Sequence, residues 1–591
     1  MIRDRVECAF IDDERIGGAL EQGKRYSPAA VRDVLAKSLE LRGLDLEELA
    51  SLLWVDDSEL LEEVYAAARK IKETIYGKRL VFFAPLYVSD YCVNNCTYCA
   101  YKRDNKYPRR KLTMDEAREE VRAIQRMGHK RIALEAGEDP ANCPIDYITD
   151  VMQTIYDTHC DNGSIRRINV NIAATTVDDY RRLKDAGIGT YVLFQETYHR
   201  GTYRSVHNGP KADYDWHTTA MDRALAGGID DVGIGVLFGL YDWRFETVAL
   251  LQHAHHLDDA HGVGPHTISF PRLRPAAGMS LGEFPYLVSD ADFKRIVACL
   301  RLAVPYTGMI LSTREAPEFR EEVVALGISQ ISAGSCTGVG EYSRGEAHDT
   351  PQFEVSDHRD LDQIIRDLLP SGYVPSFCTA CYRSGRTGEA FMSLAKTSHI
   401  HEFCQPNALL TFQEYLCDYA SPDTVKLSEP AIRQAFEEVD PRLRQECGRR
   451  LERIRGGGPL LLAGRVDTEE ESYEPNELRQ DSNVESYSHS RARQDERRQV
   501  QPDKRHMRAG RVSGVACRRH YDRHSIQGHG DTWTGTSGLH RYAWYRRRER
   551  IGGSARGPNT EGYQQGGYGS GRGRCGLRYG RARRHAPGRA R

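Results

Sequence analysis

The chain has 591 residues, enough for one large catalytic domain with appendages or for three or four average domains. Its 40% hydrophobic content and its mean hydropathy of -0.59 are low for a fully folded enzyme, so we expect part of it to be unfolded. The net charge of -2 sums an acidic body and a strongly basic C-terminal end. No run approaches the roughly 18 apolar residues that span a bilayer, and the first residues carry acids where a signal peptide is apolar. These features exclude membrane-spanning and secreted proteins, and we expect a cytoplasmic location.

The chain contains 15 cysteines. In a chain without a secretory signal, this number favours reduced thiols and metal ligation over disulfides. Isolated cysteines are usually small buried hydrophobic residues, and six fit that description: Cys8, Cys143, Cys160, Cys299, Cys417 and Cys447.

The predicted elements change character along the chain. Residues 27–76 have apolar positions at helical spacing, so we predict an N-terminal helical extension over 1–79. From residue 80, short β-branched runs alternate with amphipathic helical segments, one of which opens with a capping box at Thr113 and Glu116. The predicted strands are Leu80–Ala84, Arg131–Leu134, Ile168–Ile172, Thr190–Phe194, Val232–Phe238, His266–Phe270, Gly308–Leu311 and Ile328–Ser332.

Eight alternating units predict an α/β fold, a (β/α)8 TIM-type barrel over residues 80–344 with its active site at the carboxyl ends of the strands. A doubly wound open sheet is the alternative. Residues 345–455 are predicted to form a mainly helical C-terminal domain with a second cysteine cluster.

The remaining residues, 456–591, have the composition of a disordered basic tail. Residues 501–591 hold about twenty Arg and a single Lys, which is typical of a shifted reading frame of a GC-rich gene. The alternative is an RNA-binding arginine/glycine segment, which would bind through phosphate charge and aromatic stacking. We favour the first interpretation and expect no nucleic-acid partner.

The first cysteine cluster follows the first predicted strand. Cys92, Cys96 and Cys99 have the spacing CxxxCxxC, which can hold three corners of a 4Fe-4S cluster and leave one iron open. An open iron can chelate S-adenosylmethionine (SAM), whose reductive cleavage releases a 5'-deoxyadenosyl radical. Structural zinc, the alternative, needs a fourth ligand that is not nearby. The motif resembles the radical SAM superfamily, in which Tyr98 would pack by the SAM adenine.

Polar groups at later strand ends are candidates for holding SAM. Leu134–Asp139 ends the second predicted strand, where the superfamily keeps a glycine-rich, acid-terminated turn, and a glycine there allows close approach of a ligand. Successive side chains of a strand point to opposite faces, so the amides of Asn169 and Asn171 on the third strand would both point into the barrel. An ordinary barrel-lining role remains open for them. The candidates are Ala136, Gly137, Glu138, Asn169, Asn171 and Glu196.

A second set of cysteines lies near the C-terminus. Cys378 and Cys381 form a CxxC pair, and Cys404 follows later in the chain. As in the first cluster, there are three cysteine ligands and no fourth. A second 4Fe-4S cluster is the natural inference, and a zinc site completed by His399 or His401 is the alternative.

Together these motifs resemble the HydG family, the radical SAM tyrosine lyases that mature FeFe-hydrogenase. The resemblance covers about residues 30–420 and rests on both cysteine motifs and on Leu-Glu-Ala-Gly-Glu-Asp-Pro (134–140), Asn-Ile-Ala-Ala-Thr-Thr (171–176), Leu-Phe-Gln-Glu-Thr-Tyr-His (193–199) and Gly-Pro-His-Thr-Ile-Ser (264–269). The second cysteine motif distinguishes this family from the related thiazole-pathway tyrosine lyase, which lacks that motif.

The resemblance implies a two-centre mechanism with two 4Fe-4S clusters and SAM. L-tyrosine would be cleaved to p-cresol and dehydroglycine, and the second cluster, with an extra iron and a free cysteine, would yield CO and cyanide in an iron–carbonyl–cyanide–cysteine unit. His266 would bind that iron, as a neutral imidazole can. The implied partners are an electron donor such as ferredoxin or flavodoxin, and hydrogenase maturation proteins.

An arginine is expected to bind the tyrosine carboxylate. Arg314, at the end of the seventh predicted strand, is the candidate, with Arg272 and Arg274 as alternatives. The family usually has arginine where this chain has Cys336, which puts the contacts near the eighth strand in doubt. Two other functions stay open: a thiazole-pathway lyase that stops at dehydroglycine (2-iminoacetate), and a non-catalytic metal- or RNA-binding scaffold.

Overall fold

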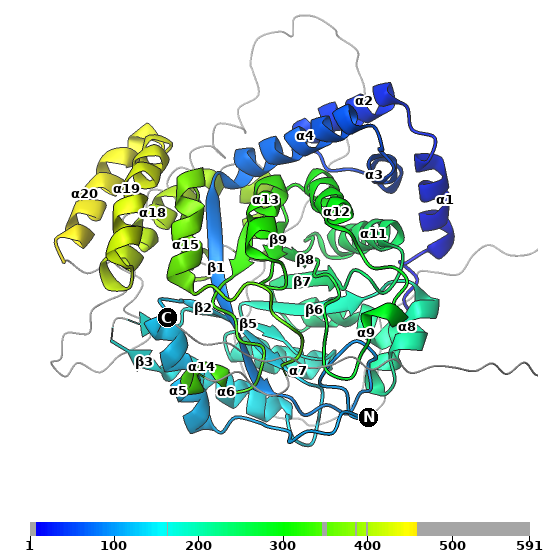
Figure 1. Cartoon of the computed structure of the whole chain (residues 1–591), viewed down its shortest axis with the longest axis horizontal. Coiled ribbons are helices and arrows are strands. Elements are labelled where there is room, and N and C mark those ends of the chain that lie inside the picture. Colours follow the sequence, from blue (N-terminus) through cyan, green and yellow to red (C-terminus); the bar gives the residue numbers. More distant parts are fainter. Residues whose placement is uncertain (1–6, 162, 346–350, 384–386, 397–399, 458–591) are drawn as a thin grey trace, which may run out of the picture. The chain divides into compact units, whose positions relative to one another are not determined.

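Eight parallel strands close into a barrel in this computed structural model, which describes residues 7–161, 163–345, 351–383, 387–396 and 400–457 (Figure 1). The sheet runs in the order β10-β9-β8-β7-β6-β5-β2-β1, and β10 pairs with β1 to complete the circle. The barrel strands are β1 (Arg79–Ser89), β2 (Arg131–Ala136), β5 (Arg167–Asn171), β6 (Thr190–Glu196), β7 (Asp231–Val236), β8 (Thr267–Ser269), β9 (Gly308–Leu311) and β10 (Gln330–Ser332). All eight predicted strands are therefore confirmed within a few residues, and the open-sheet alternative is wrong.

Helices cover the outside of the barrel between successive strands. They include α5 (Met114–Arg126), α6 (Ile145–Asp157), α7 (Val177–Asp185), α8 (Arg200–Val206), α9 (Tyr214–Thr218), α10 (Ala220–Ala226), α11 (Trp243–His261), α12 (Asp290–Ala303), α13 (Pro317–Gly327) and α14 (Glu341–Arg344). The capping box predicted at Thr113 and Glu116 is present at the start of α5. Short 3-10 turns lie at Pro210–Ala212, Leu281–Glu283 and Leu369–Ser371, and a small hairpin joins β3 (His159–Cys160) to β4 (Gly163–Ser164).

The N-terminal helices form a layer over one side of the barrel. This layer comprises α1 (Asp13–Gly23), α2 (Pro28–Leu39), α3 (Leu46–Leu53) and α4 (Ser58–Tyr76). They pack on α11, α12 and α13, as the blue ribbons of Figure 1 show. Within the stretch 27–76 that was predicted to be helical, the apolar positions of α4 are buried at Leu60, Val64, Ala67, Ala68 and Ile71 and half-buried at Leu61.

The C-terminal region is mainly helical, as predicted, and comprises α15 (Leu361–Leu368), α16 (Ala380–Arg383), α17 (Gly388–Lys396), α18 (Ile400–Asp418), α19 (Pro422–Glu437) and α20 (Pro441–Arg455). One strand in it was not predicted. Strand β11 (Val374–Ser376) pairs in parallel with the first residues of β1 and extends the barrel sheet. The second cysteine segment therefore begins directly beside the amino end of β1.

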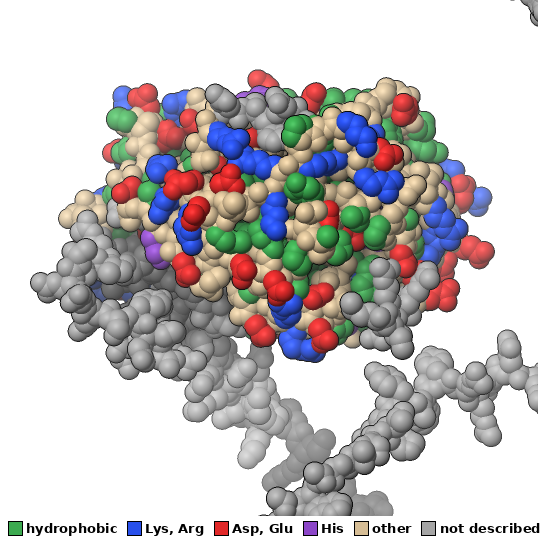
Figure 2. Space-filling model, turned by 90° about the horizontal axis from the view of Figure 1, so that it is seen from below, with side chains coloured by type: hydrophobic (Ala, Val, Ile, Leu, Met, Phe, Trp, Pro, Cys, Tyr) green, Lys and Arg blue, Asp and Glu red, His purple; other side chains and the backbone are tan. Residues whose placement is uncertain are grey.

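The described helices include none that is both long and apolar enough to cross a membrane. Figure 2 shows one face of the molecule, on which acidic and basic side chains are interspersed among the residues not drawn in grey. The predicted tail lies outside the described residues from 458 onward.

Candidate functional site

A large cavity opens at the carboxyl ends of the barrel strands, where the fold predicts an active site. It has a volume of about 230 Å³ and reaches from the cysteine loop after β1 to the loops after β9 and β10. The cysteines Cys92, Cys96 and Cys99 all line it.

The three thiols of this loop are close enough to influence one another. Burial and the neighbouring cysteines raise the pKa of Cys96 to about 12 and the pKa of Cys99 to about 11, while Lys211 opposes both shifts. Three thiols that line one cavity suit a 4Fe-4S cluster with one iron per thiolate.

A buried amide fixes the loop around Cys92. Asn94 is 2% exposed, and its Nδ2 lies 3.8 Å from Cys92 Sγ and donates to Glu138 Oε2 at 2.6 Å. Its Oδ1 accepts from the backbone N–H of Lys211 at 2.9 Å. Asn94 was not among the predicted site residues, although it lies inside the CxxxCxxC motif.

Gly137 follows β2 at a point where the structure leaves no room for a side chain. A Cβ there would collide with the Tyr91 carbonyl oxygen and would lie 3.2 Å from the Cβ of Cys92. The backbone of Gly137 therefore lies directly against the cysteine loop. Together with Ala136 and Glu138, Gly137 lines the cavity, as predicted for this turn.

Glu196 stands at an irregular point of β6. Its φ of 69° lies in the left-handed region, and the register between β6 and β7 shifts there. Such backbone strain is typical of functional sites. The Glu196 carboxylate accepts a hydrogen bond from Lys211 Nζ at 2.8 Å, so a half-buried ion pair lines the cavity beside Tyr98.

Two amides of β5 point into the barrel, as the strand alternation predicted, because Asn169 and Asn171 line the cavity while Ile168 and Val170 are fully buried. Asn171 hydrogen-bonds to Glu135, which sequence reasoning missed. Burial raises the pKa of Glu135 to about 8, against the opposing charge of Arg314. Tyr98 also lines the cavity, and its hydroxyl lies 2.8 Å from His207 Nε2.

The three candidate arginines differ in what they bind. Arg272 donates to Glu315 and to Asp290 and does not line the cavity, while Arg274 lines it and donates to Glu315 at 2.7 Å. Arg314 lines the cavity and stacks on Phe353, with 3.3 Å between Cζ and the ring centroid. Its guanidinium makes no hydrogen bond or ion pair with the described residues, so it is the one best placed to bind a carboxylate.

The residue that departs from the family pattern is set back from this cavity. Ser335 and Thr337 line it, whereas Cys336 does not. Burial raises the pKa of the Cys336 thiol to about 12, and its backbone N–H donates to the hydroxyl of Tyr342.

A second, smaller cavity of about 50 Å³ lies at the amino ends of the strands. Cys378, Cys381 and Cys404 line it together with His266, Arg79 and Arg131, which immediately precede or begin barrel strands. The Cys404 thiol is hydrogen-bonded to Cys381, and this contact and burial raise its pKa. The structure thus brings the second cysteine set and His266 together at the end of the barrel opposite to the first set.

Positive charge accompanies the second cysteine set. Arg131 is half-buried and donates to the backbone carbonyl of Cys378. Burial lowers the pKa of Arg131 to about 10, while the three cysteines oppose this shift. A cation beside three thiols favours their ionised, metal-binding form.

His266 is connected to the barrel interior by polar contacts. Its Nδ1 lies 3.6 Å from Asp231 Oδ1, and burial lowers its pKa to about 4, which keeps the imidazole neutral. Asp231 also lies 3.5 Å from Arg167, whose Nε donates to Asn169 at 2.9 Å. A chain of polar side chains therefore runs between the two cavities. Of the alternative zinc ligands, His399 lies outside the described residues, and the His401 side chain is likewise not described.

Comparison with known proteins gives two family matches and several close relatives. Residues 86–251 match the radical SAM superfamily, and residues 269–374 match the biotin and thiamin synthesis associated domain. A crystal structure of HydG, a maturase of the [FeFe]-hydrogenase, is 60% identical, with a TM-score of 0.75 over 76% of this chain and 99% of that one. HydG from Carboxydothermus hydrogenoformans is 42% identical, with a TM-score of 0.66 over 75% and 97% of the two chains. The 2-iminoacetate synthase of Salmonella typhimurium is 30% identical over 57% of this chain and 88% of its own length.

Proposed function

The chain belongs to the HydG family of radical SAM enzymes, and on this basis we propose that it cleaves L-tyrosine as a step in FeFe-hydrogenase maturation. The observation that carries the proposal is the presence of two cysteine trios at opposite ends of one barrel, each lining its own cavity. Its first products would be p-cresol and dehydroglycine.

The first cavity would hold the SAM-binding 4Fe-4S cluster on Cys92, Cys96 and Cys99. When bound there, the cluster and SAM would supply the 5'-deoxyadenosyl radical for hydrogen abstraction from the tyrosine amino group. The residues around it fit this use, because the Glu196–Lys211 pair, Asn169 and Asn171 offer polar groups to the bound cofactor. Tyr98 offers an aromatic ring at the same cavity.

Arg314 would bind the tyrosine carboxylate. It is half-buried and lines the first cavity, where the Phe353 ring stacks on its guanidinium. Glu135 lies close enough to Arg314 for the guanidinium to lower its pKa, but burial keeps that pKa near 8, so the carboxyl is protonated near pH 7. It would share a hydrogen bond with the substrate amino group. Closing this site away from water protects a radical from side reactions.

The second cavity would hold the auxiliary 4Fe-4S cluster on Cys378, Cys381 and Cys404. His266 would bind the extra iron, with free cysteine as a further ligand to it, and dehydroglycine would be converted to CO and cyanide. The positive charge of Arg131 suits an anionic cluster, and the neutral imidazole of His266 suits an iron ligand, so both residues support this use. An electron donor such as ferredoxin or flavodoxin, and maturation proteins that accept the product, would complete the reaction sequence.

The 2-iminoacetate synthase relative supports one alternative, a tyrosine lyase that stops at dehydroglycine. The second cysteine trio argues against it, because such an activity needs only the first cavity. A non-catalytic metal- or RNA-binding scaffold would leave SAM intact.

The test is anaerobic reconstitution of the full chain with iron, sulfide, SAM, reductant, L-tyrosine and cysteine. We expect p-cresol, CO and cyanide together. Formation of p-cresol without CO or cyanide would assign the alternative lyase activity, and failure to consume SAM would contradict radical chemistry altogether.

A further inference from the structure

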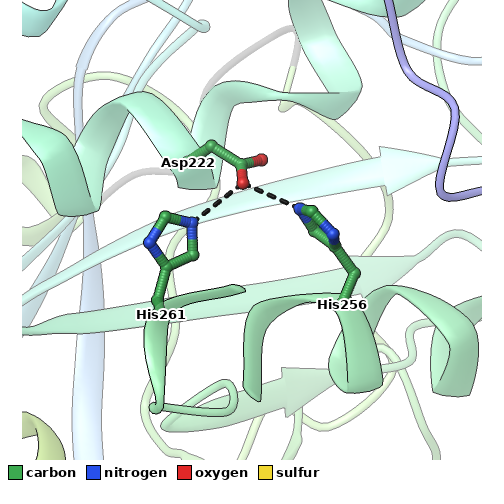
Figure 3. A group of neighbouring side chains, drawn as sticks. All are labelled: Asp222, His256 and His261. Atoms are coloured by element: carbon green, nitrogen blue, oxygen red, sulfur yellow. Dashed lines mark hydrogen bonds and ion pairs between the residues drawn. The ribbon is translucent and has the colours of Figure 1, made fainter. Parts of the chain in front are cut away.

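Two histidines and an aspartate converge on the outside of the barrel, away from both cysteine trios. Figure 3 shows Asp222 of α10 facing His256 and His261 of α11. The Nε2 atoms of the two histidines lie 2.8 Å and 2.9 Å from the same Asp222 oxygen, Oδ1. One ligand atom from each of the three residues lies within 4.8 Å of the others.

A pair of hydrogen bonds that joins two helices is the simplest account of these contacts, but it leaves one carboxylate oxygen unexplained. Asp222 Oδ2 is buried and has no hydrogen-bond partner among the described residues. A buried polar atom without a partner is costly, and a bound cation would remove that cost.

The donor atoms of the group suit a cation. Two imidazoles and one carboxylate form the donor set that Zn²⁺ and non-haem Fe²⁺ commonly have in proteins. The three side chains are each about a quarter exposed, so an ion has access and water can fill its remaining positions.

The surroundings hold the ligands in place. The ring of Phe10 stacks on His256 with 3.7 Å between the ring centroids, which restrains that imidazole. One turn earlier on α11 lies His253, whose ring centroid is 6.5 Å from that of His256. His253 is 3% exposed, and its Nε2 has no hydrogen-bond partner among the described residues, so a further nitrogen stands close to the trio.

We propose that Asp222, His256 and His261 bind a divalent first-row transition-metal ion, of which Zn²⁺ is the probe used below. The ion would join α10 to the last turn of α11. His261 precedes His266 by five residues, and five residues of fully extended chain reach at most about 18 Å. The bound ion would therefore restrain the segment that carries His266 to the second cavity.

The test compares zinc binding by full-length protein in which both clusters have first been reconstituted. After equilibrium dialysis against micromolar Zn²⁺ and removal of excess metal, mass spectrometry measures zinc per chain. We expect His261→Gln and Asp222→Asn, which keep hydrogen-bonding groups at the site, to lose about one equivalent of zinc or to bind it at least about tenfold more weakly. His255→Ala, on the same helix but outside the trio, is the matched control and should bind zinc as the wild type does.

X-ray absorption at the zinc edge separates this site from zinc held by cysteines. We expect only nitrogen and oxygen neighbours, at about 2.0–2.2 Å, and no sulfur at about 2.3 Å. Equal zinc content in the wild type and both trio variants would overturn the proposal, and so would a zinc shell containing sulfur. Unchanged iron content and p-cresol formation in the variants establish that they have folded.

Discussion

Asp231 is a single carboxylate that meets groups from three parts of the chain. Its side chain is 2% exposed and lies near Arg167 of β5 and His266 before β8, and it accepts the backbone N–H of Gly388 at 2.9 Å. It therefore balances a buried guanidinium and also orients the proposed iron ligand. Removing its charge should affect both folding and the second cavity.

We expect Asp231→Asn to lower the free energy of unfolding by about 3 kcal/mol, because it leaves the Arg167 charge buried without its counterion. Denaturation by urea, under anaerobic conditions, measures this change. Asp230→Asn is the matched control, because the neighbouring Asp230 side chain is 45% exposed, pairs with Lys184, and should contribute less than about 1 kcal/mol. Equal effects of the two substitutions would show that the Arg167–Asp231 pair is not held as described.

Glu135 gives the first cavity a pH dependence. Its folded-state pKa is raised to about 8 from 4.5, so between these values the folded chain binds a proton that the unfolded chain has released. The associated stability is complete below about pH 4.5 and is lost as pH rises through about 8.

We therefore expect the wild type without SAM to lose thermal stability, relative to Glu135→Gln, as the pH is raised from 5 to 8. Unfolding temperatures measured across this range for both proteins give the difference. Other buried carboxyls, such as Glu246, are present in both proteins and so largely cancel. Parallel curves for the two proteins would mean that Glu135 is not buried in the way described.

At the scale of elements, the packing of the cysteine loop on the end of β2 decides the shape of the first cavity. The backbone of Gly137 lies against Tyr91 and Cys92, with no room for a Cβ. The loop and the strand end are thus fixed to each other before any ligand binds.

Gly137→Ala should displace the cysteine loop, and we expect it to reduce iron binding at the first site and to abolish SAM cleavage. Gly18→Ala is the control, because a Cβ at Gly18, within α1, meets nothing within 4 Å. Alanine is preferred to glycine inside a helix by up to about 1 kcal/mol, so that variant should be fully active. Iron content and 5'-deoxyadenosine formation report both results, and normal SAM cleavage by Gly137→Ala would refute the packing argument.

The strands that could be predicted from the sequence have a recognisable local residue pattern, and the strand that was missed does not. The eight barrel strands are β-branched runs separated by amphipathic helices, and this alternation survives in the structure. Strand β11 has the sequence Val-Pro-Ser, which is too short to be recognised as a strand and contains a proline, a residue that argues against a central strand. It lies at the edge of the sheet, where proline is tolerated. Only its pairing with β1 identifies it as a strand.

Site residues divide in the same way. The cysteines were predictable from their spacing, and Asn169 and Asn171 from strand alternation. Lys211 was not, because it reaches Glu196 from a 3-10 turn outside any motif, and neither was the Asp222 group, whose members are 34 and 39 residues apart. These contacts exist only once the barrel has closed.

For the molecule as a whole, the barrel separates two sites that share one interior. The first trio lines the cavity at the carboxyl ends of the strands, and the second lines the cavity at their amino ends. Strand β11 pairs with β1, and the cysteine segment that follows β11 lines the second cavity together with residues of the barrel strands. The C-terminal region therefore completes the barrel rather than standing beside it.

This separation implies that the two steps of the proposed reaction can be lost independently. The most direct measurement is the ratio of CO to p-cresol formed by the reconstituted full chain, compared among the wild type, Cys404→Ala and Cys96→Ala. We predict that Cys404→Ala still forms p-cresol but no CO, whereas Cys96→Ala forms neither product. Undiminished CO from Cys404→Ala would contradict the assignment of the second site.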